Sequence, residues 1–174
     1  MYKRQARTAE LLERYKRLAP ERREPFLDEL APAAGGRRPR ETAAGDWMTW
    51  DQVREMRGAG MAIGAHTVSH PILGGLAEHR QREEIDGSIE RLAQELGGRP
   101  TLFAFPDGRA GSHDDHSLRA LRAAGVRFAF KNDGGMVGRR SADPLLLPRV
   151  NVSQGMSAQR FRLLLTAPWA IASR

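Results

Sequence analysis

The sequence predicts an α/β domain with parallel strands, preceded by a helical hairpin. From residue 61 onward, short apolar segments alternate with amphipathic helical patterns, and the joints between them are short and carry Gly or Pro. The first 30 residues have helical periodicity and no strand pattern. Such alternation is typical of βαβ units, whose parallel strands form an open sheet or a barrel.

The hairpin is predicted over residues 4–30, with a break at Pro20. Its apolar stripes comprise Leu11, Leu12, Tyr15 and Leu18 before the break and Phe26, Leu27 and Leu30 after it. Residues 31–46 contain Pro, Gly and Arg without periodicity, which predicts a mobile linker. A helix then follows Thr49, which forms a capping box with Gln52. Its apolar face is expected to point inward and carries Trp50, Val53 and Met56.

Four short apolar segments predict the strands, over residues 61–65, 101–105, 126–130 and 145–152. The first helix between them ends at Gly97 and has core spacing at Ile85, Ile89, Leu92 and Leu96. Ser112 and Asp115 are candidate caps of a second helix, which ends at Gly125, and Ser157 of a third. The apolar residues of these two helices are Leu118 and Leu121, then Phe161, Leu164 and Leu165.

Composition limits the possible functions. A chain of 174 residues, 40% of them hydrophobic, suits one domain with its own core. No run approaches the roughly 18 apolar residues of a membrane span, and the charged first forty residues do not resemble a signal peptide. The chain has no Cys, so any metal must be held by carboxylates and by the five His.

Most of the net charge of +7 lies near the start of the chain. Residues 1–40 hold eleven Lys or Arg and six Asp or Glu, whereas the remainder holds 17 and 15. Nearly all the basic residues are Arg, beside abundant Ala and Gly, as expected of a GC-rich bacterial genome. Since no base-reading motif is recognisable, we do not expect a nucleic-acid partner.

The carboxyl ends of parallel strands lie on one rim, where reactive residues gather. His66 and His70 follow the first predicted strand, four residues apart in a segment bounded by Gly64 and Pro71. In a single helical turn both rings would lie on one side, and imidazole is a common ligand of zinc and similar ions. The spacing also fits two capping histidines, so it leaves both readings open.

Two more candidates follow other strands. Pro106, Asp107 and Gly108 form a tight turn after the second strand, where a backbone N–H can face a substrate. An ordinary βα turn with Asp107 facing solvent fits these residues as well. Arg149 ends the fourth strand, where a guanidinium can bind substrate oxygens or simply lie on the surface.

The remaining histidines have simpler explanations. His113 and His116 lie at the start of a helix together with Asp114 and Asp115, where acidic residues complement the helix dipole. His79 lies on a polar helix start and is expected to be solvated.

Two segments are similar, in order and interval, to motifs of one family. Residues 61–73, MAIGAHTVSHPIL, resemble a strand followed by the metal-binding motif H-[ST]-x-x-H, and residues 103–108, FAFPDG, resemble F-A-Y-P-Y-G. Residues 49–56 are similar to the helix that precedes them in that family. The family is the polysaccharide deacetylases, the NodB homology domain of carbohydrate esterase family four. The resemblance runs from about Trp47 to the C-terminus.

This resemblance implies a metal-dependent hydrolase that removes N- or O-acetyl groups from a polysaccharide or oligosaccharide. It implies that His66 and His70 bind a divalent metal, usually zinc, and that Thr67 braces their loop. The backbone N–H of Asp107 would help to stabilise the oxyanion.

Further parts of the site follow from the same resemblance. Pro106 and Gly108 would flank the substrate. Arg149 is a candidate replacement for the Arg that many members carry in the third motif.

The departures from the family pattern are equally specific. The motif T-F-D-D-G, which supplies the base and the third metal ligand, is not found in the chain, and residues 117–174 contain no His for the late L-x-H motif. Residues 1–46 resemble a helical insertion of some members, and residues 1–5 resemble a translated sequencing-adaptor end. We therefore expect residues 47–174 to form the C-terminal part of a distorted (β/α) barrel that is truncated at its N-terminus.

Such a chain is expected to be nearly inactive alone. The alternative is a non-catalytic carbohydrate- or metal-binding module, although only 6% of the residues are aromatic and available for sugar stacking. Localisation stays open between the cell envelope and the cytoplasm, because a missing start would remove any signal peptide.

Overall fold

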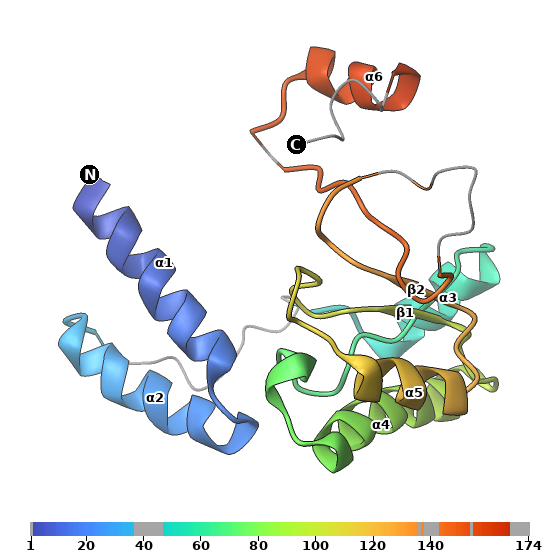
Figure 1. Cartoon of the computed structure of the whole chain (residues 1–174), viewed down its shortest axis with the longest axis horizontal. Coiled ribbons are helices and arrows are strands. Elements are labelled where there is room, and N and C mark those ends of the chain that lie inside the picture. Colours follow the sequence, from blue (N-terminus) through green and yellow to red (C-terminus); the bar gives the residue numbers. More distant parts are fainter. Residues whose placement is uncertain (1, 37–46, 136, 138–142, 154, 168–174) are drawn as a thin grey trace. The chain divides into compact units, whose positions relative to one another are not determined.

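A computed structural model describes residues 2–36, 47–135, 137, 143–153 and 155–167. The chain divides into two compact units, Met1–Ala62 and Ile63–Arg174, which are described separately. Figure 1 shows the helical hairpin of the first unit and the mixed helices and strands of the second.

The hairpin of the first unit consists of α1 (Tyr2–Arg17) and α2 (Pro20–Ala33). The predicted break is confirmed, because Pro20 takes the first position of α2, where its missing N–H costs no hydrogen bond. Helix α2 extends into the predicted linker of residues 31–46, so that prediction was wrong at its start. The rest of the linker, residues 37–46, lies outside the described residues.

A buried arginine closes this hairpin. Arg23 of α2 is 5% exposed, and its guanidinium donates to the backbone oxygens of Leu18 and Lys16, both at 3.3 Å. These oxygens lie at the end of α1, where helical carbonyls lack partners of their own. The ring of Phe26 packs beside that of Tyr15, with centroids 6.4 Å apart.

Helix α3 (Trp50–Gly58) also belongs to the first unit. The predicted capping box is present: Thr49 Oγ1 accepts from Gln52 N at 3.3 Å, and Gln52 Oε1 accepts from Thr49 N at 2.8 Å. The predicted inward face of α3 is half-buried, whereas the other residues of the helix are exposed. Its apolar side chains are only half-buried; they are Trp50, Val53 and Met56.

The second unit contains a parallel pair of strands, β1 (Leu102–Ala104) and β2 (Phe128–Phe130). Ala65 pairs in parallel with β1, and Leu147 pairs in parallel with β2. Four chain segments therefore lie side by side in the order Ala65, β1, β2, Leu147. This arrangement agrees with the predicted α/β class and the predicted parallel direction.

The strand predicted over residues 145–152 is wrong in extent, because only Leu147 joins the ladder. The next acceptor along this side, the backbone oxygen of Lys131, accepts from the side-chain Nε of Arg149 at 2.9 Å, and the ladder ends at Leu147. On the other side, the N–H of Leu145 donates to the carboxylate of Asp143 at 2.9 Å, which makes a turn.

The strand predicted over residues 61–65 likewise reduces to Ala65. The N–H of Met61 donates to the backbone oxygen of Met56 at 3.0 Å, so this residue completes the end of α3. Ala65 makes two ladder bonds to β1, both at 2.9 Å. The apolar pattern identified the right segment, but only Ala65 in it pairs with a neighbouring strand.

Two helices of the second unit agree with the sequence prediction, and a short helix that was not predicted precedes the first of them. The short 3-10 helix η1 (Leu73–Gly75) precedes α4 (Glu78–Leu96), which ends at Gly97 in the left-handed conformation, with φ 70°. Helix α6 (Ala158–Thr166) begins at Ser157, whose side chain accepts from the N–H of Arg160. In the described part of the chain, no helix combines the length and apolarity that crossing a bilayer requires.

Helix α5 (Asp115–Ala123) starts from a cap other than the predicted ones. Asp114, not Ser112 or Asp115, is the N-cap, and its carboxylate accepts from the N–H of Ser117 at 3.0 Å. The Ser117 hydroxyl accepts in return from the N–H of Asp114 at 3.3 Å. Three neighbouring residues have capping side chains, and only the backbone conformation selects between them.

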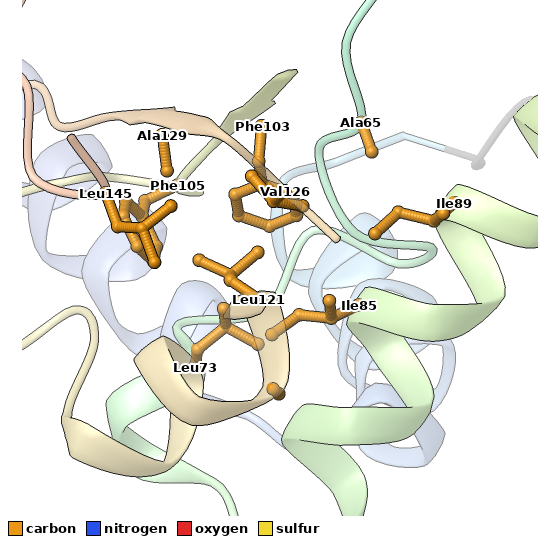
Figure 2. Packing of buried hydrophobic residues seen from close by; sticks show 11 residues of the cluster. Ala65, Leu73, Ile85, Ile89, Phe103, Phe105, Leu121, Val126, Ala129 and Leu145 are labelled. Atoms are coloured by element: carbon orange, nitrogen blue, oxygen red, sulfur yellow. The ribbon is translucent and has the colours of Figure 1, made fainter. Parts of the chain in front are cut away.

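The core lies where α4 and α5 pack against each other and against the strands. Figure 2 shows side chains from the strands pointing toward those of the two helices. The cluster comprises Ala65, Leu73, Ile85, Ile89, Phe103, Phe105, Ala120, Leu121, Val126, Ala129 and Leu145.

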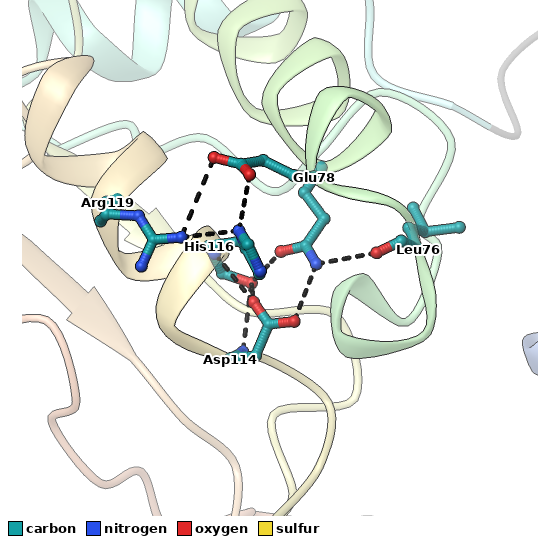
Figure 3. Close-up of polar contacts among 7 residues, drawn as sticks. Leu76, Glu78, Asp114, His116 and Arg119 are labelled. Carbon is teal, nitrogen blue, oxygen red and sulfur yellow. Dashed lines mark hydrogen bonds and ion pairs between the residues drawn. The ribbon is translucent and has the colours of Figure 1, made fainter.

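A buried polar link also joins α4 to α5 (Figure 3). Gln81 is fully buried; it accepts from Ser117 Oγ at 2.5 Å and donates to Asp114 Oδ2 at 3.0 Å. Burial alone would raise the pKa of Asp114, but the hydrogen bonds from Gln81 and Ser117 outweigh it and lower the pKa. Nearby, the ring of His116 lies 2.9 Å from the carboxylate of Glu78.

Candidate functional site

The two candidate imidazoles meet at the end of the first paired segment. His66 directly follows Ala65, and its ring lies 4.8 Å from that of His70, centroid to centroid, at an interplanar angle of 78°. Residues 66–70, which we call the His loop, do not form the helical turn considered from the spacing. Thr67 and His70 instead have positive φ values of 64° and 56°.

Thr67 links the two ends of the His loop. Its hydroxyl donates to the backbone oxygen of His66 at 2.5 Å and accepts from the N–H of His70 at 3.1 Å. A positive φ is unusual for a β-branched residue and persists only where the surroundings hold it. The backbone of the His loop is therefore strained, and Thr67 is one of the groups that hold it.

Sequence reasoning missed a second group that holds the loop. The carboxylate of Glu84, in α4, accepts from the N–H groups of Val68 and Ser69, both at 2.8 Å, and from Ser69 Oγ at 2.6 Å. These partners lie 15 or 16 residues away along the chain. No local signal separates Glu84 from the other acidic residues of a Glu-rich helix, so only the fold could reveal this contact.

The ring of His66 is held in the form that can bind a metal. Its Nδ1 lies 2.6 Å from the backbone oxygen of Ala104, which can only accept, so the proton belongs on Nδ1 and Nε2 carries the lone pair. Burial lowers the pKa of His66; the Ala104 contact opposes this, and His70 and Arg149 lower it further. The ring is thus favoured as neutral imidazole, the species that ligates metals.

Arg149 lies close enough to act on His66 through its charge. Its Nε donates to the backbone oxygen of Lys131 at 2.9 Å, and the side chain is half-buried. Arg149 is therefore not an ordinary surface arginine. It ties the segment after Leu147 to the end of β2.

The turn after β1 has an unusual backbone. The N–H of Gly108 donates to the oxygen of Pro106 at 2.7 Å, across Asp107, whose φ is 61°. Asp107 does not face solvent, because its side chain is 7% exposed. Its carboxylate accepts from both Nε and Nη2 of Arg109, at 2.6 and 2.7 Å.

Gly108 is required by close packing as well as by its φ of 70°. A Cβ here would overlap the backbone nitrogen of Asn132, whose N–H donates to the Gly108 oxygen at 3.0 Å. We expect Gly108→Ala to lower the free energy of unfolding by about 2–4 kcal/mol. The control is Gly111→Ala, at φ 81° with open space around it, with an expected loss of about 1 kcal/mol. Urea denaturation measures both, and equal losses would contradict a packing role.

His113 offers a test of pH dependence. Its ring stacks on that of Phe105, with centroids 4.5 Å apart, and burial and then the charge of Lys131 lower its pKa below the ordinary 6.5. Below that pH the unfolded chain binds a proton that folded His113 resists, so the free energy of unfolding falls as pH falls. His113→Gln should make this slope shallower between pH 7 and 5, as urea denaturation at several pH values would show. The exposed His79→Gln is the control and should leave the slope unchanged.

The side chains present can supply two ligands to one divalent metal. His66 and His70 supply two adjacent imidazoles, of which His66 is oriented by a backbone carbonyl, a usual outer partner of metal-bound histidine. Among the residues that the structure describes, no group of three His, Asp or Glu side chains gathers as a complete metal site.

Comparison with known proteins gives a consistent result. A family model described as polysaccharide deacetylase matches residues 33–129. A curated relative, the putative polysaccharide deacetylase YxkH of Bacillus subtilis, is 29% identical over 114 residues, which are 66% of this chain and 39% of the relative. This chain thus spans about two fifths of the length of that relative.

Solved structures agree on the fold. The Streptococcus pyogenes deacetylase PplD matches with a TM-score of 0.59 and 25% identity, over 69% of this chain and 51% of that protein. A polysaccharide deacetylase from Bacillus cereus matches with a TM-score of 0.58 and 22% identity, over 70% of this chain and 37% of that protein.

Proposed function

Because this chain belongs to the polysaccharide deacetylase family, whose model matches more than half of its residues, we propose that it acts in the hydrolytic removal of acetyl groups from a carbohydrate. The observation that carries this proposal is the meeting of His66 and His70 on a strained loop after a paired strand segment. The substrate class is an acetylated polysaccharide or oligosaccharide.

The fold proposal follows from the same relationship. We propose that residues 47–174, which include the parallel segments of the second unit, form part of a distorted (β/α) barrel, and that residues 1–46 are a helical insertion with its linker. The similarity to the Streptococcus pyogenes deacetylase over 69% of this chain supports this assignment.

His66 and His70 would hold the divalent metal, with zinc the first ion to test. Such an ion, when bound, polarises an acyl carbonyl and lowers the pKa of water. His66 contributes a neutral ring whose Nδ1 is occupied by the Ala104 carbonyl, so that Nε2 is the ligating atom. Thr67 holds the backbone between the two rings.

The other residues would act on the substrate. The N–H of Asp107 would donate to the oxyanion, and its strained turn, closed by the bond from Gly108 to Pro106, sets the direction of that N–H. Pro106 and Gly108 are both buried, so they would flank the substrate by fixing the backbone of this turn. Arg149, already anchored to the end of β2, would bind substrate oxygens.

The site of this chain alone is proposed to be incomplete. Two imidazoles without a third ligand bind zinc weakly, and the lack of a general base costs about 10²–10⁴ in rate. The test compares the 174-residue chain with the product of the complete reading frame in which this sequence occurs. Acetate release is measured from N-acetylated chito-oligosaccharides and from O-acetylated xylan, with zinc and with a chelator.

We expect metal-dependent release from the complete product and release at least about 100-fold slower from the chain alone. His66→Ala in the complete product should abolish the activity. Release that persists with a chelator and with His66→Ala would overturn the proposal. Saturable binding of oligosaccharide in calorimetry, with no acetate released by either protein, would support the non-catalytic binding module instead.

A further inference from the structure

We propose that Glu84 is the positioning residue of the metal site: it holds the His loop in the one conformation that presents His66 and His70 together. This inference rests on the proposed function. It concerns a residue outside both motifs, on a different element of the fold.

The Glu84 carboxylate accepts three hydrogen bonds from the His loop. Glu84 Oε2 accepts from two consecutive backbone N–H groups, those of Val68 and Ser69, and Oε1 accepts from the Ser69 hydroxyl. All three distances lie between 2.6 and 2.8 Å, as in charge-assisted hydrogen bonds. One carboxylate thus binds the whole middle of the His loop.

The position of these bonds within the loop gives them their significance. Val68 and Ser69 lie between Thr67 and His70, the two loop residues with positive φ. Such backbone conformations persist only where surrounding contacts hold them. Thr67 contributes bonds within the loop, whereas Glu84 ties the loop to another element.

Helix α4 is anchored in the core and lies close to the His loop. Ile85 and Ile89 of α4 are fully buried in the core, so the helix that carries Glu84 is firmly placed. Gly87, one turn after Glu84, lies so near that an added Cβ would come within 3.0 Å of Val68 Cγ2. Glu84 and Gly87 therefore lie on the face of α4 that meets the His loop.

Loss of the carboxylate should lower metal affinity without removing a ligand. A loop released from α4 would populate the competent conformation only part of the time, and the apparent Kd rises as that fraction falls. We expect Glu84→Gln to raise the Kd for zinc about 10- to 100-fold, which is the usual effect of losing a residue that orients the metal ligands.

The test uses Zn²⁺ alone as the probe, titrated into the full chain in competition with a chromophoric chelator. Glu83→Gln is the matched control: it makes the same charge change on the neighbouring residue of α4, whose exposed carboxylate pairs with Arg80. Hydrogen exchange of the Val68 and Ser69 amides is followed in both variants. We expect faster exchange and weaker zinc binding in Glu84→Gln only, beyond any change in global unfolding measured with urea.

The outcomes separate the two proposals. If the unmodified chain binds no zinc that depends on His66, the metal site of the proposed function fails, whatever Glu84 does. If it binds zinc and folded Glu84→Gln binds equally well, the role of Glu84 is overturned and the metal site stands. If Glu84→Gln does not fold, Ser69→Ala removes one of the three bonds, and an unchanged zinc Kd in that variant overturns the role of Glu84.

Discussion

Replacing either His66 or His70 by alanine is expected to reduce the zinc affinity of this chain by more than about 100-fold. This exceeds the usual effect of losing a residue that only orients the metal ligands. The two rings lie 4.8 Å apart, and no third His, Asp or Glu gathers with them among the described residues. Each variant would therefore leave a single imidazole. Competition with a chromophoric chelator measures the affinity directly.

The double variant sharpens this prediction. If His66 and His70 share one ion, the loss in the double variant should be little greater than in either single one, because the first substitution already removes the site. His79→Ala, an exposed histidine in α4, is the control and should bind zinc like the unmodified chain. Single variants that keep their zinc affinity would show that the pair is not a metal site.

Replacing Phe105 by alanine is expected to lower the free energy of unfolding by about 3–5 kcal/mol, as for other buried aromatic residues. Phe105 is fully buried, packs edge to face on Phe103 with centroids 5.4 Å apart, and stacks on His113. Because Phe105 directly precedes Pro106, the turn of the candidate site should loosen with the core. Urea denaturation measures the change.

Phe128→Ala is the matched control for this prediction. Phe128 lies on β2 and is 40% exposed, so its loss should cost about 1 kcal/mol or less. Similar losses in the two variants would mean that the packing around Phe105 does not stabilise the unit. The two variants remove the same side chain, once from a buried and once from an exposed position.

The elements that sequence predicted best have local causes. The Thr49 capping box, the break at Pro20 and the left-handed Gly97 after α4 each depend on residues within about one turn. The two central strands were placed for a similar reason, since their apolar runs are bounded by turn residues. Where local signals competed, as among Ser112, Asp114 and Asp115, the sequence could not choose the cap.

The candidate site shows the same division. The order and spacing of two motifs singled out His66, His70 and the turn at Asp107, and the family to which they belong was confirmed. The single helical turn considered for the His pair was wrong, because positive φ values at Thr67 and His70 depend on support from outside the segment. The full lengths predicted for the strands at 61–65 and 145–152 were wrong because a ladder needs a partner at each step.

The sequence by itself determined the α/β class, the helix boundaries at strong caps and the family, since these follow from patterns that lie close together along the chain. Only the tertiary structure decided the meeting of the two rings, the neutral state favoured at His66 and the bonds of Glu84 to the His loop. These depend on burial and on interactions between residues up to 83 positions apart, such as the electrostatic interaction of His66 with Arg149. No local pattern encodes such contacts, because their free energy exists only once the chain has folded.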